Sequence, residues 1–314
     1  MVKERTQLII RLLATHLAIL PCLLFISLFV KSDGYLLLSI SQSFLVIIYL
    51  TGYWEFFGLP FRMLYSVSAE ILLLIVLLWK ILSHANDGNN LVLILFLAVI
   101  QLYLIIELAR ILAVIFFNDK NKHEISFPFR SGKYLITDGG NSKTSRLMNY
   151  HYYSAIHKKN KTNYSMLYAT DIVRIDKTEK RFFPYQNEDY PIFAEEVLSP
   201  VSGVIFRIIN NIEDNVPYAG GYPYNTGNTV IIRNGNLYML LGHLKMGSIR
   251  VSPGDIVNEK DVIAEAGNSG YSERPHIHIQ YIESETENFW KGTGVSIQYK
   301  GRNIFKNRVV ELKF

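Results

Sequence analysis

The chain has 314 residues, a formal net charge of +5 and a mean hydropathy of +0.15. Its single cysteine, Cys22, excludes an internal disulfide and a metal site built from cysteines. No Lys/Arg block is dense enough to indicate a nucleic acid partner. The length suggests two domains, and the composition changes from apolar to polar between Phe117 and Asn118.

The N-terminal part contains apolar runs at about 8–30, 35–58, 61–83 and 90–117. A membrane-spanning helix needs about 20 mostly apolar residues. The second run ends in an aromatic cluster, 53–57, of the kind found at the level of the lipid headgroups. The sequence therefore predicts an all-α transmembrane bundle of about four helices over residues 1–117, and a multi-pass protein of the cell membrane.

Three charged residues lie within these runs: Glu70, Glu107 and Arg110. Glu107 and Arg110 are three positions apart, so on a helix they share one face and can pair. A proton or ion relay and a simple lock between helices both fit this pattern. The lock is the more common use of such a pair.

The charges near the membrane bear on its orientation. Lys3, Arg5 and Arg11 favour a cytoplasmic N-terminus. Four spans would then leave the C-terminal part in the cytoplasm, which the basic residues at 120, 122 and 130 also favour, whereas an odd number would place it outside. Charge counting alone leaves the side of the membrane open.

The polar part of the chain is expected to be all-β. After a predicted connector at 118–140, short strand-like runs alternate with Gly, Asn and Pro: "VSGVIFRI", "NTVIIRNG", "LYMLLGHL", "DVIAEAGNSG" and "PHIHIQYIE". Such spacing is typical of an antiparallel sheet. The sequence therefore predicts an antiparallel β domain over residues 141–314.

One alternative is a biotinyl or lipoyl carrier. The stretches "VLSPVSGVIFRI" and "VSPGDIVNEKDVIAEAG" resemble the two halves of such a domain. Carriers present a modifiable lysine on a tight turn between these halves. The intervening "NTVIIRNGNLYMLLGHL" has no lysine in a tight turn, so the carrier interpretation is disfavoured.

The histidines indicate a metal site instead. In "RPHIHIQY", His276 and His278 are two residues apart and share one face of a strand. His151, His243 and Asp171 also lie near strand-like segments. Catalytic zinc commonly takes three protein ligands from His and Asp/Glu and keeps one position for water. These residue types therefore suggest a hydrolytic Zn²⁺ site.

An ordered set of motifs over residues 150–282 carries a family resemblance. In chain order these are Tyr-Ala-x-Asp, Ser-Pro-x-x-Gly, Gly-Asn-x-Val-Ile-Ile, His-Leu, Pro-Gly-Asp-x-Val, Gly-x-Ser-Gly and Pro-His-x-His. The set resembles the lysostaphin-type (LytM/β-lytic) zinc metalloendopeptidases. The resemblance implies a barrel-sandwich-like β fold, a Zn²⁺ cofactor, and hydrolysis of peptide bonds in peptidoglycan stem peptides or cross-bridges. It also implies that Asp171 and His278 bind zinc and that His243 and His276 are catalytic.

The first ligand departs from the family pattern. That ligand is usually a His four residues before the Asp, where this chain has Leu167. Relatives of the β-lytic type place it further upstream, and two histidines are available there. His151 lies in an alternating aromatic run that could be a strand, and His157 lies in a loop-like stretch of Lys and Asn. We predict His151, while His157 and the absence of any third ligand remain open.

The same resemblance implies where the protein works and with what. A wall substrate implies an extracytoplasmic catalytic domain on a membrane anchor. The expected partners are peptidoglycan or another peptide substrate and the lipid bilayer, and a membrane or cell-wall protein partner is compatible with both. If the third ligand is missing, the chain is instead a wall-binding or regulatory relative of another hydrolase.

Overall fold

The computed structural model describes residues 33–52, 54, 91–117, 122–151, 163–175, 186–223 and 225–313, together with 64, 68, 69, 71, 72, 75 and 78. The chain divides into two compact units, Met1–Ala113 and Val114–Phe314. The first contains helix α3 (Asp33–Thr51) and most of helix α5 (Leu91–Phe116). The second contains the strands.

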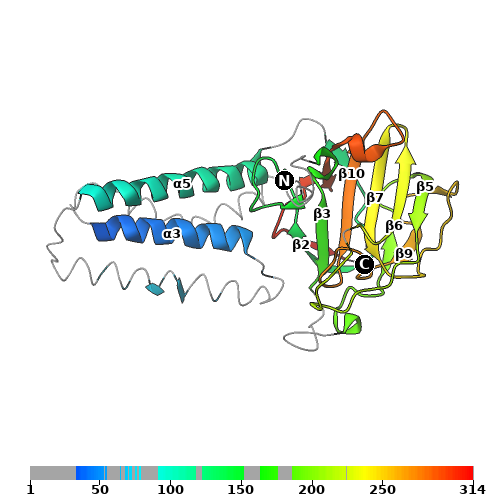
Figure 1. The fold of residues 1–314 in the computed structure, drawn as a ribbon, viewed down its shortest axis with the longest axis horizontal. Helices are drawn as coiled ribbons and strands as arrows, with labels where there is room; N and C mark the ends of the chain where they lie inside the picture. Colours follow the sequence, from blue (N-terminus) through cyan, green and yellow to red (C-terminus); the bar gives the residue numbers. More distant parts are fainter. Residues whose placement is uncertain are drawn as a thin grey trace. The chain divides into compact units, whose positions relative to one another are not determined.

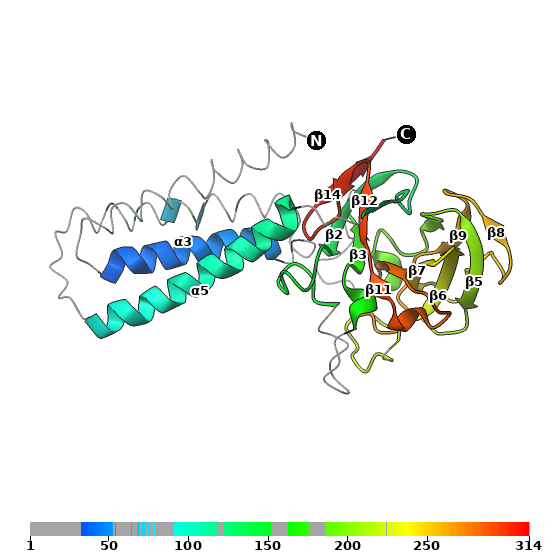
Figure 2. The same ribbon diagram turned by 90° about the horizontal axis from the view of Figure 1, so that it is seen from above.

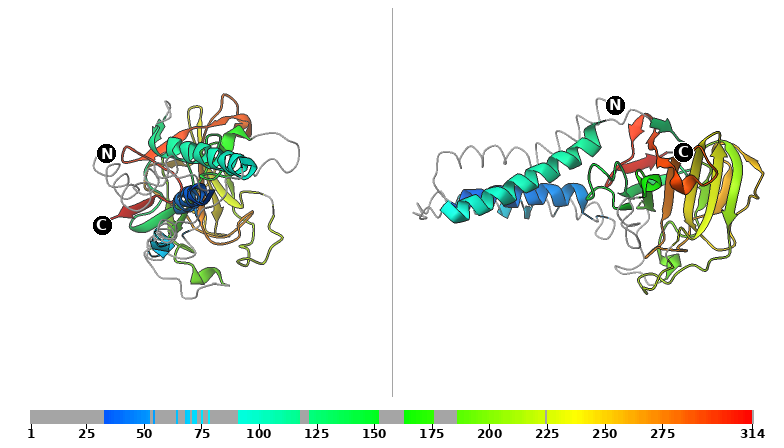
Figure 3. Two further views of the ribbon diagram at one scale, coloured as in Figure 1. Left: turned by 90° about the vertical axis from the view of Figure 1, so that its left-hand side faces the viewer. Right: turned by 45° about the horizontal axis from the view of Figure 1, so that its top comes forward.

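Helices α3 and α5 lie side by side in every view (Figures 1 and 3). Within the described part of the chain, one helix, Ile94–Phe116, is long and apolar enough to cross a membrane. The apolar stretch of α3, Leu36–Thr51, is shorter than a span. The first predicted run, with Cys22, and most of the third, with Glu70, lie outside the described residues. The described helices therefore do not show a multi-span bundle.

Polar side chains are buried in this helical unit. Gln101 Nε2 on α5 donates a hydrogen bond to Ser43 Oγ on α3 at 2.9 Å. Arg110 Nη1 donates to Glu107 Oε1 at 2.6 Å, so the pair predicted from their spacing is formed. The Glu107 side chain is 11% exposed and that of Arg110 is 55% exposed, which is consistent with a structural role for the pair.

The second unit is built from short strands joined by turns. In chain order they are β1 (Lys122–Glu124), β2 (Gly132–Asp138), β3 (Thr170–Arg174), β4 (Glu196–Leu198), β5 (Gly203–Ile209), β6 (Asn228–Asn234), β7 (Leu237–Leu244), β8 (Ile256–Val257), β9 (Val262–Glu265), β10 (Ile277–Glu283), β11 (Thr293–Gly294), β12 (Ser296–Tyr299), β13 (Arg302–Asn303) and β14 (Val309–Leu312). Three 3₁₀ turns accompany them: η3 (Tyr164–Met166), η4 (Asn187–Asp189) and η5 (Phe289–Lys291).

Among the described residues, the main sheet has nine strands in the order β14-β2-β3-β10-β7-β6-β5-β8, with β11 pairing to β10 (Figures 1 and 2). Its pairs are antiparallel. Smaller sheets are formed by β1-β12-β13 and by β4-β9. The prediction of a mainly antiparallel β domain is therefore confirmed.

Side chains alternate between the two faces of the main sheet. One face buries apolar residues in the core of the unit, including Ile136, Ile172, Ile277 and Ile279. Because successive residues of a strand point to opposite faces, the residues between them point away from that core. This alternation sends Asp171 and His278, each next to a core isoleucine, to the other face.

Part of the predicted connector, 118–140, forms a strand of the main sheet. Its residues 132–138 form β2, which lies between β3 and β14. Tyr134, Leu135 and Ile136 in this strand are fully buried. The folded unit therefore starts ahead of residue 141, because a short apolar stretch finds a partner strand, β14, that is distant in the sequence.

Candidate metal centre

The site is set up by the register of neighbouring strands. His278 on β10 lies directly opposite Asp171 on β3, and Asp171 lies opposite Asp138 on β2. Residues directly opposite each other on paired strands share one face of the sheet. The three side chains therefore gather on the face away from the main core.

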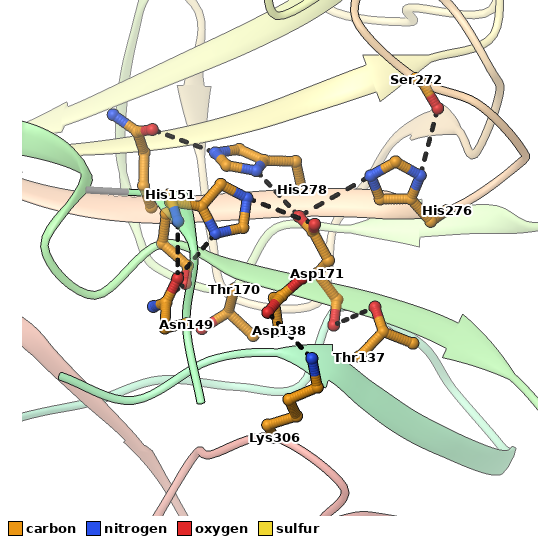
Figure 4. Close-up of polar contacts among 12 residues, drawn as sticks. Thr137, Asp138, Asn149, His151, Thr170, Asp171, Ser272, His276, His278 and Lys306 are labelled. Carbon is orange, nitrogen blue, oxygen red and sulfur yellow. Dashed lines mark hydrogen bonds and ion pairs between the residues drawn. The ribbon is translucent and has the colours of Figure 1, made fainter. Parts of the chain in front are cut away.

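Three donor groups converge there (Figure 4). Ligand atoms of His151, Asp171 and His278 all lie within 4.8 Å of one another. His278 Nδ1 is 2.9 Å from Asp171 Oδ1, and His151 Nε2 is 3.2 Å from Asp171 Oδ2. Zinc binds such atoms at about 2.0–2.2 Å, and tetrahedral ligands are then about 3.3 Å apart. Two imidazoles and one carboxylate at this spacing fit a zinc ion.

The two candidate ligand histidines present different ring nitrogens. His151 Nδ1 lies 2.8 Å from Asn149 Oδ1, and His278 Nε2 lies 3.0 Å from Gln280 Oε1. Because an amide oxygen only accepts hydrogen bonds, those ring nitrogens carry the protons. His151 Nε2 and His278 Nδ1 are thereby the ring nitrogens that face Asp171, where a bound metal ion would take the place of any proton on them.

Two further histidines line the same site. His276 Nδ1 donates to the Arg274 carbonyl and His243 Nδ1 to the Ser269 carbonyl, both at 2.8 Å. The centroids of these two rings are 4.7 Å apart, and His276 Nε2 lies 3.7 Å from Asp171 Oδ1. Since both Nδ1 atoms are protonated, each neutral ring keeps an acceptor nitrogen, Nε2, that is able to take up a proton.

His243 reaches this face through a β-bulge. From Asn228 to Val230 strand β6 advances two residues, whereas its partner β7 advances three, from Leu241 to Leu244. Regular alternation would send His243 to the face opposite its neighbour Gly242, which pairs with His278. The extra residue and the positive φ of His243, 58°, break that alternation. The bulge therefore turns the imidazole toward His276.

This backbone conformation leads to a prediction about stability. Asparagine tolerates the left-handed region, whereas a β-branched residue does not. We expect His243→Val to be about 1–2 kcal/mol less stable than His243→Asn, although both remove the imidazole. Thermal and chemical unfolding of the two purified full-length variants measures the difference. Equal stability of the two variants would contradict strain at this position.

The turn that holds His243 depends on a glycine. Gly270 has a φ of 78°, and a Cβ there would lie 2.2 Å from the Gly227 backbone nitrogen. Only glycine permits both this conformation and this close approach. The Gly-x-Ser-Gly motif thus brings the Ser269 carbonyl against the ring of His243.

Burial and charge set the protonation states. Burial lowers the pKa of His276, and burial together with the His276 and His278 rings holds the pKa of His243 well below its usual value. Burial alone would raise the pKa of Asp171, but His151 and His276 outweigh it and hold that pKa well below its usual value. Near neutral pH the site therefore has an ionised carboxylate and two neutral imidazoles facing it.

A buried ion pair lies beside the cluster. Lys306 Nζ is 3.4 Å from Asp138 Oδ1, and its side chain is 3% exposed. Asp138 reaches this position because β2 has one extra residue between Ile136 and Asp138 relative to β3. Sequence reasoning missed this pair, since its two members are far apart in the chain and belong to no motif.

The structure brings together all five predicted site residues, namely His151, Asp171, His243, His276 and His278. His151, whose aromatic run could have been a strand, is instead helical and follows turns at 142–144 and 146–148. His157 lies outside the described residues. Sequence reasoning also missed the roles of Asn149 and Gln280. Gln280 could have been found, because it is two residues after His278 and so shares its face.

Part of the chain is similar to known proteins. Residues 193–289 match the model of Peptidase family M23. Endolysin 2638A of Staphylococcus phage 2638A is 43% identical over 60 residues, 18% of this chain and 12% of that protein. The peptidoglycan DD-endopeptidase ShyA of Vibrio cholerae serotype O1 is 32% identical over 113 residues, 35% of this chain and 23% of that protein.

The chain thus covers less than a quarter of the length of either relative. Among solved structures, the catalytic domain of lysostaphin from Staphylococcus simulans is 17% identical, with a TM-score of 0.27 over 43% of this chain and 77% of that one. The family model and the two relatives support an M23 (LytM/lysostaphin-type) domain in the chain.

Proposed function

We propose that this chain is a membrane-anchored zinc metalloendopeptidase that hydrolyses peptide bonds in peptidoglycan. The observation that carries the proposal is the convergence of His151, Asp171 and His278 within 4.8 Å, beside two imidazoles with free acceptor nitrogens. The M23 match over 193–289 supports it, since that segment contains His243, His276 and His278. The names of the phage endolysin and the peptidoglycan DD-endopeptidase favour the wall as the substrate.

The chemistry follows from the protonation states. His151, Asp171 and His278 would hold the zinc ion, which would supply a Lewis acid that makes water a stronger nucleophile. The water oxygen bonds to the carbonyl carbon, and its proton goes to the Nε2 of His276 or His243. The charged ring is then a hydrogen-bond donor to the developing oxyanion. It returns the proton to the amine nitrogen as the C–N bond breaks, which leaves a carboxylate and a free amine.

The alternative is a degenerate wall-binding or regulatory relative, which would lack a third ligand because Leu167 cannot bind zinc. The position of His151 Nε2, 3.2 Å from Asp171 Oδ2, favours the enzyme. The loop carrying His151 thus offers the donor that position 167 lacks.

We further propose that residues 1–117 anchor the peptidase domain as a multi-pass membrane region and that the domain faces outward. The 23-residue apolar helix Ile94–Phe116 supports an anchor. Its length of about 35 Å, at 1.5 Å per residue, matches the hydrocarbon core of a bilayer. With Cys22 replaced by alanine, a membrane-impermeant maleimide should label Lys260→Cys in intact cells. Labelling only after lysis would refute the outward orientation.

The activity is tested by the chemical groups that hydrolysis releases. We expect the full-length protein, purified in detergent, to generate new free amines from purified peptidoglycan, without new reducing sugar ends. Chelation should abolish the release and added zinc should restore it. New reducing ends without amines would indicate a glycosidase. Wall binding without either product would favour the regulatory relative.

A further inference from the structure

His151 is helical and directly follows a loop rather than lying on a strand, so something other than sheet register has to hold its ring. The loop over residues 139–151 is attached to its surroundings at several points. Ser142 donates to the Leu167 carbonyl from its backbone nitrogen at 3.1 Å and from Oγ at 2.8 Å. The residue at the family's usual ligand position thus anchors the loop through its backbone.

Asn149 lies at the centre of this loop and is fully buried. Its Nδ2 donates to the carbonyls of Gly140 at 2.7 Å and Ala169 at 2.8 Å. Its Oδ1 accepts from the backbone nitrogen of His151 at 3.1 Å and contacts His151 Nδ1 at 2.8 Å. A carboxamide has two donor hydrogens and two acceptor lone pairs, so all four are used.

These four hydrogen bonds determine the orientation of the Asn149 and His151 side chains. Two carbonyl oxygens face Nδ2, and because they only accept, the amide nitrogen and oxygen of Asn149 cannot exchange places. Oδ1 must therefore face His151 and accept the proton on Nδ1. Nε2 is then the His151 nitrogen that faces Asp171 Oδ2, 3.2 Å away, and the one that a metal ion would bind in exchange for any proton on it (Figure 4).

We infer that Asn149 is the positioning residue that makes His151 a metal ligand in place of the missing histidine at position 167, an inference that rests on the proposed function. The neutral amide oxygen of Asn149 accepts the proton on His151 Nδ1. It thereby fixes the orientation of the His151 ring and leaves Nε2 as the nitrogen available to the metal. Partners of this kind on the far nitrogen of a ligand histidine typically change metal affinity by about 10–100-fold when removed.

The test is the zinc affinity of the full-length protein, measured by competition with a chromogenic chelator. Asn149→Ala should weaken zinc binding about 10–100-fold. The matched control is Ser142→Ala, which removes the Oγ bond to the Leu167 carbonyl and leaves His151 untouched. This control should keep the wild-type affinity even if it lowers the thermal stability of the zinc-free protein. Equal losses of affinity in both variants would overturn the inference.

A double variant distinguishes a positioning effect of Asn149 on His151 from a general destabilisation of the metal site. In a His151→Ala background, Asn149→Ala should cause no further loss of affinity, because the ring it positions is gone. Additive losses would overturn the inference. If His151→Ala alone leaves zinc binding unchanged, the proposed metal centre falls, and the inference with it.

Asn149→Asp keeps the test decisive if the alanine variant does not fold. A carboxylate oxygen still accepts from His151 Nδ1, whereas the two donations to Gly140 and Ala169 are lost. A positioning role requires near wild-type zinc affinity despite a lower melting temperature of the zinc-free protein. Affinity that falls in step with stability would assign Asn149 a purely structural role.

Discussion

Replacing His276 by alanine should lower kcat on peptidoglycan by about 10²–10⁴-fold while the full-length protein keeps its zinc. The ring is not among the three clustered ligand groups, so the metal should stay. Its Nδ1 proton is committed to the Arg274 carbonyl, and burial lowers its pKa, so the neutral ring offers Nε2 as a base. Rates of amine release and zinc content on the same preparation check both parts.

The matched control for this variant is His123→Ala. His123 belongs to the same β unit but stacks edge-on against Tyr281, with ring centroids 5.3 Å apart, and is not part of the metal cluster. It should keep both zinc and activity. A His276→Ala protein that turns over at the wild-type rate would remove the ring from the chemistry, whereas one that has lost its zinc would make His276 a ligand.

The second large effect is expected at His151. His151→Ala should reduce the zinc content of the dialysed full-length protein from about one per chain to a small fraction, because two donors remain of the three that such sites need. The loss of zinc affinity should be larger than that expected for Asn149→Ala, about 10–100-fold, because the ligand itself is removed. Amine release from peptidoglycan should disappear with the metal. Elemental analysis and the activity assay measure the two losses.

His157→Ala serves as the control, because it removes the other upstream histidine that the sequence offers. It should retain zinc and activity. The opposite pattern, with zinc lost in His157→Ala and kept in His151→Ala, would assign the third ligand to His157. Zinc retained in both variants would mean that neither histidine completes the site.

Four of the five site residues could be placed from the sequence because they belong to short-range patterns. His276 and His278 follow a period of two, and Asp171 and His243 belong to motifs at strand ends. His243 nevertheless needs a bulge that no local pattern announces, since the extra residue in β7 is defined only by pairing with β6.

The sequence favours His151 over His157 but does not explain how its ring reaches the site. The position of the ring depends on the path of the 139–151 loop, which Asn149 and Ser142 tie to carbonyls around residues 140 and 167–169. The acceptors in these hydrogen bonds are backbone carbonyls, which every residue has, so no pattern of residue types in the sequence predicts them. Likewise, the sequence does not show that β2 within the 118–140 segment pairs with β14, because β14 is far along the chain.

The strand order also has a consequence for when the metal can be acquired. The third donor, His278, lies 107 positions after Asp171, and β2 beside them pairs with the still later β14. A ribosome has therefore made α5 long before the last donor exists, and the sheet cannot close until β14 has emerged. Under the proposed function, zinc would therefore be taken up in the compartment where the finished domain folds, and the metal supply of that compartment would govern how much active protein forms.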